Sequence, residues 1–303
     1  MASTRLPDKL APWLPPLAVL GSILSLTVGT SYGKHLFAVV GAQGTATFRV
    51  VFASVILLCV WRPWRMSLPM KSAKAIALYG ATLGLMNLSF YMSLATLPLG
   101  IAIAIEFTGP LTVAIIASRR PIDFLWIAFA ILGLGLLLPI TPSAASISPI
   151  GVAYALLSAV LWALYIVFGK RVGNIHAGQS TSLGMLVASL VVLPFGIARA
   201  GAELINPALL GPAIALAILS SAIPYSLEMF ALQRMPKNTF GILCSMEPAV
   251  GAVAALFILG EQLTVLQWIA ISAIILASVG TSLSAKSDVP ESLTPADVPA
   301  DAL

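Results

Sequence analysis

The sequence predicts an all-α, polytopic membrane protein with ten transmembrane helices arranged as two inverted five-helix repeats. Three observations support this fold. The composition is 59% hydrophobic and only 9% charged, apolar residues form ten long runs, and the two halves share spaced prolines and glycines. Soluble proteins carry about 25% charged residues, so a soluble globular domain is excluded. We interpret the net charge of +5 as a sign of membrane topology rather than of nucleic-acid binding.

The first half of the chain contains five apolar runs, each long enough to cross a hydrocarbon core of about 30 Å as a helix. A short polar leader, Met1–Pro12, precedes them. The first run is similar to the core of a signal peptide, but it has no clear small-residue cleavage site and many spans follow, so we interpret it as an uncleaved helix. We expect this repeat to occupy residues 13–140, with helices at 13–32, 43–61, 74–95, 99–118 and 123–140.

The second half contains five further apolar runs and is expected to form the second repeat, residues 141–285. Its helices are expected at 150–169, 180–198, 208–231, 236–259 and 264–284. Residues 286–303 are rich in Ser, Pro, Ala and Asp and lack apolar periodicity, which predicts a disordered cytoplasmic tail. No loop is long enough to fold as a separate domain.

Basic residues are distributed unequally between the two sets of loops. If the N-terminus is cytoplasmic, thirteen Lys and Arg residues fall in cytoplasmic segments and only Lys34 and Arg199 in outer segments. Cytoplasmic loops of membrane proteins carry the excess of Lys and Arg. This count predicts that both termini are cytoplasmic. It also supports an even number of spans, because one helix more or fewer would disrupt the alternation.

Two spacings recur between the halves of the chain. A pair of prolines twelve residues apart, Pro98 and Pro110, recurs 138 residues later as Pro236 and Pro248. A Gly-Lys pair, Gly33-Lys34, recurs 136 residues later as Gly169-Lys170. Each match alone is weak, but together they indicate a duplicated five-helix unit. Because five is odd, the second copy enters the membrane from the opposite side. Inverted repeats are the usual basis of alternating access around a midplane site, which favours a carrier over an enzyme or a receptor.

The apolar stretch Leu99–Ser118 carries a single charge, Glu106, near the expected bilayer midplane. An acid at this depth costs about 2.5–3.5 kcal/mol on insertion scales. Pro110 removes the helix hydrogen bond to the carbonyl of Glu106, so an acid and a free acceptor occur at one level. We favour a polar site for a substrate or a proton over a structural acid bonded to a neighbouring helix, because intramembrane acids are functional candidates by default.

Three further charged residues lie within the predicted spans. Glu247 directly precedes Pro248 in the ninth span, in a position approximately equivalent to that of Glu106. Glu228 lies near the cytoplasmic end of the eighth span, where it has either a functional or a structural role. Arg49 lies inside the second span and requires a carboxylate or carbonyl partner. We therefore treat Arg49 and Glu228 as candidates for an ion pair as well as for substrate binding.

Polar and aromatic side chains share helix faces in the same spans, at spacings of three and four residues. We predict a substrate site formed by Glu106, Asn87, Tyr91, Trp162, Tyr165, Tyr225, Ser245 and Glu247. Trp and Tyr also form belts at membrane interfaces, but Tyr91 and Tyr165 lie further inside their spans. Hydroxyl and amide groups could bind a carboxylate while Glu106 or Glu247 binds an ammonium, which suits a small zwitterion. Spacing alone also allows a neutral drug or a sugar.

Glu106 and Glu247 are also the candidates for proton coupling. An apolar, partly dry surrounding favours the neutral form of a carboxyl group, so such a group can take up and release a proton near neutral pH. Exchange of one proton for one substrate molecule at Glu106 would then drive export.

The remaining reactive residues do not predict an enzyme. Cys59 and Cys244 both lie in apolar spans, so we expect neither a structural disulfide nor a metal site, and we expect no cofactor. A membrane-embedded enzyme acting on a lipid needs a metal cluster, or a nucleophile with a base at the membrane edge. His35 and His176 lie near no plausible partner for that chemistry. We expect no nucleic-acid partner, and the oligomeric state stays open.

Several segments resemble a known transporter family. The ten spans, the duplicated halves and the proline-bearing fourth and ninth helices resemble the EamA-type branch of the drug/metabolite transporter superfamily. The most specific segments are similar to threonine/homoserine exporters of bacterial inner membranes: Pro98–Phe124, Ile223–Pro236, Ser245–Ala249 and Arg62–Arg65. The resemblance covers about residues 13–284 and implies proton-driven efflux of small amino acids, with threonine and homoserine as substrates. The alternative is a related carrier for another small metabolite or an apolar drug.

Overall fold

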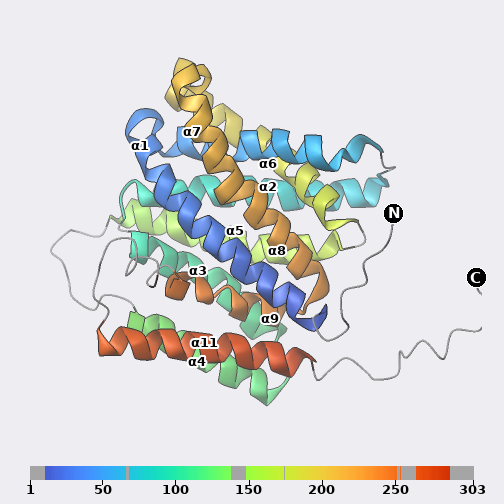
Figure 1. The fold of residues 1–303 in the computed structure, drawn as a ribbon, viewed down its shortest axis with the longest axis vertical. Coiled ribbons are helices and arrows are strands. Elements are labelled where there is room, and N and C mark those ends of the chain that lie inside the picture. Colours follow the sequence, from blue (N-terminus) through green and yellow to red (C-terminus); the bar gives the residue numbers. More distant parts are fainter. Residues whose placement is uncertain are drawn as a thin grey trace, which may run out of the picture.

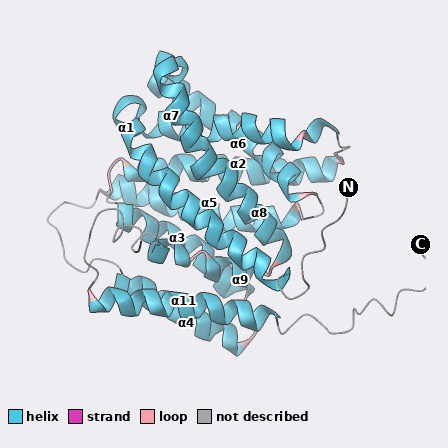
Figure 2. Ribbon diagram, viewed as in Figure 1, coloured by secondary structure: helices cyan, strands magenta, loops and turns pink. Residues whose placement is uncertain are grey.

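The computed structural model describes residues 11–65, 68–97, 99–137, 148–173, 175–250, 253 and 264–286. Throughout these residues the chain is helical, with short turns and no strand (Figure 2). The predicted all-α class is therefore confirmed. The expected leader and tail lie almost entirely outside the described residues.

The helices follow one another with short connections and form one bundle (Figure 1). The α-helices are α1 (Leu14–Trp61), α2 (Met70–Leu94), α3 (Leu99–Ala117), α4 (Pro121–Leu137), α5 (Pro149–Arg171), α6 (Ala177–Ala200), α7 (Pro207–Ala217), α8 (Ile223–Arg234), α9 (Lys237–Leu243) and α11 (Val265–Lys286). Short 3₁₀ turns lie at η1 (Ala11–Trp13), η2 (Pro63–Arg65) and η3 (Gly201–Ile205), and a π-helical turn, η4 (Ile218–Ala222), joins α7 to α8.

Helix α1 contains two predicted spans, and the chain reverses direction within it (Figure 1). The reversal lies at Gly41, whose φ of 69° and ψ of −176° interrupt the helical backbone. Glycine adopts positive φ without the penalty that a Cβ imposes. The sequence predicted a loop at Gly33 and Lys34, but the helical backbone continues through both residues. The chain turns eight residues later, at Gly41.

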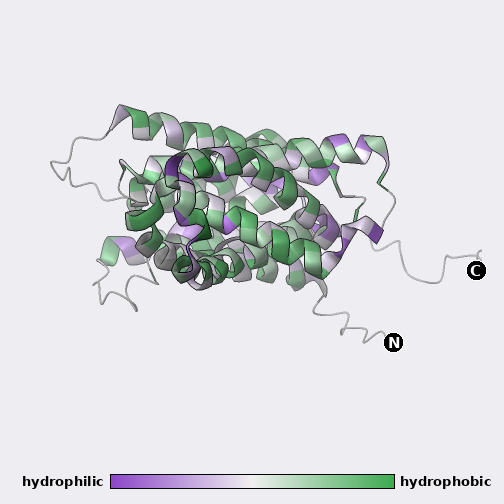
Figure 3. Ribbon diagram, turned by 90° about the horizontal axis from the view of Figure 1, so that it is seen from above, coloured by the Kyte–Doolittle hydropathy of each residue, from purple (hydrophilic) through white to green (hydrophobic). Residues whose placement is uncertain are grey.

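The surface of the bundle is that of a membrane protein. Among the described residues, six helical segments are long and apolar enough to cross a membrane, and three shorter apolar helices lie at Leu14–Thr30, Ile101–Ala117 and Pro121–Leu136. Large hydrophobic side chains are exposed on most helices. Hydrophobic residues dominate the helices seen from above, with hydrophilic residues mainly toward the helix ends (Figure 3). A polytopic helical membrane protein is the architecture that fits this surface.

Most other predicted helices are found within a few residues of their expected ends, but two differ in kind. The eighth predicted span is divided into α7, the π turn η4 and α8. The ninth is interrupted after α9 by a turn at Cys244 and Ser245, and the backbone is helical again at residues 246–250. The rest of the ninth predicted span, apart from residue 253, lies outside the described residues.

Glycines allow several helices to approach at backbone distance. A Cβ added to Gly80 of α2 would overlap the carbonyl oxygen of Gly184 in α6. A Cβ added to Gly109 of α3 would overlap the carbonyl oxygen of Ala159 in α5. Small residues at such crossings are the usual means of close packing between membrane helices. The contact at Gly109 and the packing of α2 on α5 bring the polar residues of α2, α3 and α5 into one interior region.

Candidate functional site

Polar side chains gather in the interior of the bundle, where α1, α2, α3, α5 and α8 pack against one another. Buried polar and charged groups are costly unless they are hydrogen-bonded. We call this group the polar cluster; its buried members are Ser22, Arg49, Asn87, Tyr91, Glu106, Ser158, Tyr165, Ser220, Ser221, Tyr225 and Glu228. Seven of the ten residues singled out from the sequence for binding or pairing therefore lie together with four serines that were not.

Glu106 and Ser158 connect α3 to α5 at one side of the polar cluster. Ser158 Oγ donates a hydrogen bond to Glu106 Oε1 at 2.5 Å, and the same hydroxyl lies 3.1 Å from the carbonyl oxygen of Met86. The carboxyl group is buried, with 7% of the residue exposed. Among the described residues no protein donor bonds to its second oxygen, Oε2. That oxygen is available to a ligand or a proton.

Glu228 is bonded at both carboxyl oxygens. Ser22 Oγ donates to Oε1 at 2.8 Å, and Tyr165 OH donates to Oε2 at 3.1 Å. These donors come from α1 and α5, so the carboxyl group of α8 joins three helices. No ion pair between Glu228 and Arg49 or Arg234 is present in the described part of the chain, where the one salt bridge is Arg120–Asp123. The ion-pair interpretation of Glu228 is thus wrong for this conformation.

Asn87 and Tyr225 join α2 to α8 between the two carboxyl groups. Asn87 Nδ2 lies 2.9 Å from Tyr225 OH, and Tyr225 OH lies 3.1 Å from Asn87 Oδ1. Asn87 Nδ2 also donates to the carbonyl of Leu83 at 2.9 Å, which fixes the amide on its own helix. The rings of Tyr165 and Tyr225 contact edge to face, with centroids 6.1 Å apart. Side chains from α2, α5 and α8 are therefore in continuous contact through polar and aromatic groups.

Arg49 is held by the π turn rather than by an acid. Its Nε donates to Ser221 Oγ at 2.9 Å, and its Nη2 donates to the carbonyl oxygen of Ser220. The expected carbonyl partner is therefore found, and the expected anchoring ion pair with a carboxylate is not found among the described residues. The guanidinium carbon lies 5.1 Å from the centre of the Tyr91 ring, a cation–π distance.

The residues predicted from the ninth span are less closely integrated. Ser245 Oγ donates to the carbonyl of Ile242 on its own segment, and Glu247 is only partly buried. The backbone NH of Glu247 donates to the carbonyl of Cys244 at 3.0 Å, which partners the acceptor that Pro248 leaves free.

Trp162 has a different environment from the other predicted site residues. It is buried on α5 within the largest apolar cluster, together with Phe107 and Tyr165. The aromatic ring therefore forms part of the apolar packing next to Glu106 and Glu228.

Sequence reasoning missed the serines that hold the charged groups. Serine is common in membrane helices, so a single one carries no signal. Ser22 and Ser158 do carry a sequence signal. They are 136 residues apart, the same offset that relates Gly33-Lys34 to Gly169-Lys170. The repeat would have found this pair. Nothing in the sequence predicted the π turn that presents Ser220 and Ser221.

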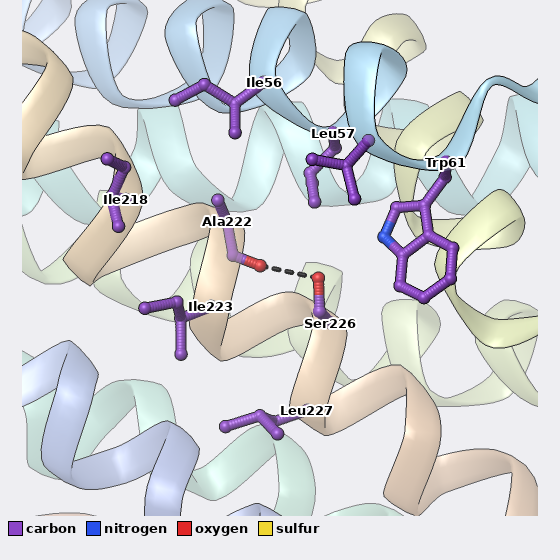
Figure 4. Close-up of a pocket in the computed structure, with 9 residues that line it drawn as sticks. Ile56, Leu57, Trp61, Ile218, Ala222, Ile223, Ser226 and Leu227 are labelled. Carbon is purple, nitrogen blue, oxygen red and sulfur yellow. Dashed lines mark hydrogen bonds between the residues drawn. The ribbon is translucent and has the colours of Figure 1, made fainter.

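A groove on the bundle is separate from the polar cluster. It is lined by Ile56, Leu57, Val60, Trp61, Ile218, Ala222, Ile223, Ser226 and Leu227. Figure 4 shows that Ser226 directs its hydroxyl back to the carbonyl of Ala222, a hydrogen bond of 2.6 Å. The groove thus presents an almost wholly apolar lining, and none of the buried carboxyl groups lines it.

Comparison with known proteins identifies the family. Residues 149–283 match the EamA-like transporter family. The chain is 43% identical over 280 residues to a protein of Escherichia coli (strain K12) named threonine/homoserine exporter RhtA, covering 92% of this chain and 95% of that protein. It is 44% identical over 286 residues to the protein of the same name from Salmonella typhimurium (strain SL1344), covering 94% and 96%. The chain belongs to the EamA-like transporter family.

This membership confirms the resemblance seen in the sequence. A solved structure, described only as the crystal structure of a protein, superimposes on the chain with a TM-score of 0.67 at 18% identity, covering 91% of this chain and 98% of that one. At this identity the likeness shows the fold alone. For an EamA-like transporter, buried carboxyl groups inside the bundle are candidates for binding what is transported.

Proposed function

We propose that this EamA-like transporter exports small amino acids, threonine and homoserine above all, across the bacterial inner membrane by proton-coupled alternating access. The relatives that share 43–44% of its residues over nearly their whole length are named threonine/homoserine exporters. The observation that carries the mechanism is the polar cluster itself. It has acids, an arginine and hydroxyl groups in one buried region, the complement of a small zwitterion.

The proposal includes ten spans in two inverted repeats, residues 13–140 and 141–285. Several contacts among the helices support it, because exchanging the two sets of five spans reproduces them. Three spans of the first set pack against their own equivalents in the second set: the second span against α6, α3 against α9, and α4 against α11. The other contact occurs twice, because the first span packs against α8 and the equivalent helix α5 packs against α2. Asn87 and Tyr225 are 138 residues apart, the offset of the proline pairs. They are bonded to each other, as expected for equivalent residues near a two-fold axis.

The proposed orientation has both termini in the cytoplasm. The helix ends that carry basic residues meet at one end of the bundle, where Lys170 Nζ donates to the carbonyls of Leu232 and Met235 at 2.7 Å. At the opposite end the turn at Gly41 lies next to Arg199. Basic residues mark the cytoplasmic side, so the end with Lys170 is assigned to the cytoplasm.

The substrate site in this proposal comprises part of the polar cluster, together with neighbouring residues on α5 and in the ninth span. Its residues are those named from the sequence: Glu106, Asn87, Tyr91, Trp162, Tyr165, Tyr225, Ser245 and Glu247. Glu106 and Glu247 are the proposed proton-coupling acids. Glu106 supports this role because it keeps one oxygen without a protein donor among the described residues. Loading of a proton on one acid would weaken the hold on the substrate's ammonium group.

Counterflow in proteoliposomes tests this function directly. Purified protein is reconstituted with unlabelled substrate inside, and uptake of a panel of labelled amino acids is followed at two pH values, with protein-free liposomes as control. We expect threonine and homoserine to exchange, at rates that depend on pH. If no amino acid exchanges while the protein stays folded, the proposed function is wrong. An efflux screen separates the alternative carrier, since cells expressing an amino-acid exporter should tolerate and excrete toxic threonine or homoserine.

A further inference from the structure

Arg49 is a buried cation without an acidic partner in the described part of the chain. The residue is 2% exposed, and the one ion pair among the described residues is Arg120–Asp123, at a helix end. An arginine inside a membrane bundle normally pairs with an acid or with backbone carbonyls, because an uncompensated charge is costly there. The carbonyl of Ser220 and the hydroxyl of Ser221 stabilise the cation but do not neutralise it.

The π turn η4 holds the guanidinium group from one side. Its wider turn presents the carbonyl of Ser220 and the hydroxyl of Ser221 to Arg49, whereas the hydroxyl of Ser220 is bonded to Leu216 O at 2.7 Å. Single π turns inside α-helices are frequently found at functional sites. These two contacts use Nε and one hydrogen of Nη2. A guanidinium has five N–H donors, so most remain for another acceptor.

Tyr91 supplies a second unoccupied donor beside Arg49. The residue is 1% exposed, and its hydroxyl has no hydrogen-bond partner in the structure as described. The ring lies under the guanidinium group and is stacked on Phe37, with centroids 5.5 Å apart. A buried hydroxyl without a partner loses its hydrogen bonds to water without replacement, at a cost of about 1–3 kcal/mol. Its retention next to an uncompensated cation indicates a ligand that satisfies both groups.

We propose that Arg49 and Tyr91 bind the carboxylate group of the transported amino acid. A carboxylate offers two coplanar oxygens that match the paired N–H groups of a guanidinium, and a remaining lone pair can accept from the tyrosine hydroxyl. The charge of Arg49 is then neutralised by the substrate instead of by the protein. Glu106, whose Oε2 has no protein donor among the described residues, is assigned to the ammonium end of the same molecule. This inference rests on the proposed amino-acid export and specifies how the zwitterion is oriented.

Competition between two inhibitors of counterflow tests the assignment. L-threonine and L-threoninamide share the ammonium and hydroxyl groups, but only threonine has a carboxylate. In the wild type, threonine should inhibit uptake of labelled threonine at a concentration at least about tenfold lower than threoninamide, as expected for loss of a charge-assisted pair. In Arg49→Gln the inhibitory concentration of threonine should rise until this preference nearly disappears, while that of threoninamide stays unchanged. Arg49→Lys should be intermediate, because it keeps the charge and loses the paired geometry.

Matched variants separate binding from folding. Arg199→Gln removes an exposed arginine at the end of α6 and should leave both inhibitory concentrations unchanged. If Arg49→Gln does not fold, Tyr91→Phe decides, because it keeps the ring and removes only the free hydroxyl. Tyr91→Phe should weaken inhibition by threonine severalfold and leave threoninamide unchanged. Ligand-induced thermal stabilisation of the detergent-purified protein provides the same comparison for a variant that binds without transporting.

Two results would overturn the inference. One is a wild type that exchanges threonine but does not prefer it to threoninamide. The other is a set of folded Arg49 and Tyr91 variants in which both inhibitors weaken equally or neither weakens. Failure of the proposed function is a different result, because the wild type would then exchange neither threonine nor homoserine.

Discussion

The carboxyl groups of Glu106 and Glu228 are both bonded to a serine, but they differ in how completely they are bonded. Ser22 lies eight residues after the start of α1 and Ser158 nine residues after the start of α5, and these helices start at opposite ends of the bundle (Figure 1). The serines thus lie at similar depths from opposite ends. Glu228 accepts hydrogen bonds at both oxygens, whereas Glu106 accepts one from a protein donor among the described residues.

The two acids are not related by the residue spacing on which the proposed repeat rests. At the repeat offset of 138, Cys244 corresponds to Glu106 and Phe90 corresponds to Glu228. A carboxylate with two hydroxyl donors from different helices is stabilised in place and joins those helices. A carboxylate with one donor can exchange partners. We therefore expect Glu106 to exchange substrate and protons, as proposed above, and Glu228 mainly to hold helices together.

The largest expected effect is that of Glu106→Gln. The amide keeps the size of the side chain and removes the group that binds a proton, so export driven by a pH gradient should fall by about 100-fold, equivalent to about 2.7 kcal/mol. Transport into everted membrane vesicles measures this flux. The matched control is Glu228→Gln, which should retain flux per folded molecule within about threefold. Full gradient-driven flux in Glu106→Gln would show that Glu106 is not the coupling acid.

The helical architecture was predictable from the sequence because length and apolarity largely determine a membrane helix. Glu106, Asn87, Tyr225 and Tyr165 were found as site candidates for the same reason: a polar side chain in an apolar run is conspicuous. Asn87 and Tyr225 are also 138 residues apart and bonded to each other, a pairing that the sequence analysis did not predict. Ten spans and two inverted repeats stay predictions.

Partners across helices were not predictable from one sequence. The charge of Arg49 indicated that it needed a partner. Its hydrogen bonds, however, are made to a π turn that lies 172 residues further along the chain at Ser221 and has no distinct sequence motif. Gly41 was also overlooked as the turning point, because Gly33-Lys34 looked more like a loop and local propensity does not reveal which glycine adopts positive φ. Glu228 was considered as a candidate for an ion pair, and in the structure it accepts from two hydroxyl donors.

The next largest effect concerns the helix contacts beside the two carboxyl groups. Gly109→Ala places a Cβ against the backbone carbonyl of Ala159, which cannot move without separating α3 from α5, and should destabilise the protein by about 1–3 kcal/mol. Gly21→Ala, next to Ser22, places a Cβ 3.4 Å from the side chain of Leu227, an ordinary contact. Thermal unfolding in detergent should therefore show a clear loss for Gly109→Ala and little change for Gly21→Ala. Equal losses would mean that both regions are packed alike.

A smaller effect is expected for Glu228→Gln on stability. The amide retains one acceptor oxygen, so one of the two hydroxyl bonds is weakened, at a cost of about 1–2 kcal/mol. The unfolding temperature should fall by a few degrees, and transport per folded molecule should change little. Tyr165→Phe removes one of the same bonds and should produce a similar fall. An unchanged unfolding temperature with a tenfold loss of flux would make Glu228 a transport residue and reverse the assignment made above.

The smallest expected effects come from the two equivalent serines, and they should differ in kind. Ser22→Ala leaves Glu228 bonded to Tyr165, so it should cost about 1 kcal/mol of stability and leave the pH profile of flux unchanged. Ser158→Ala removes the protein donor to Glu106, which disfavours the charged carboxylate. Proton release then requires a higher pH, so the profile of flux against pH should move upward with little loss of stability. Counterflow measured across a pH series, with unfolding temperatures from the same preparations, separates the two responses. Identical responses would mean that the two carboxyl groups are functionally equivalent despite their different bonding.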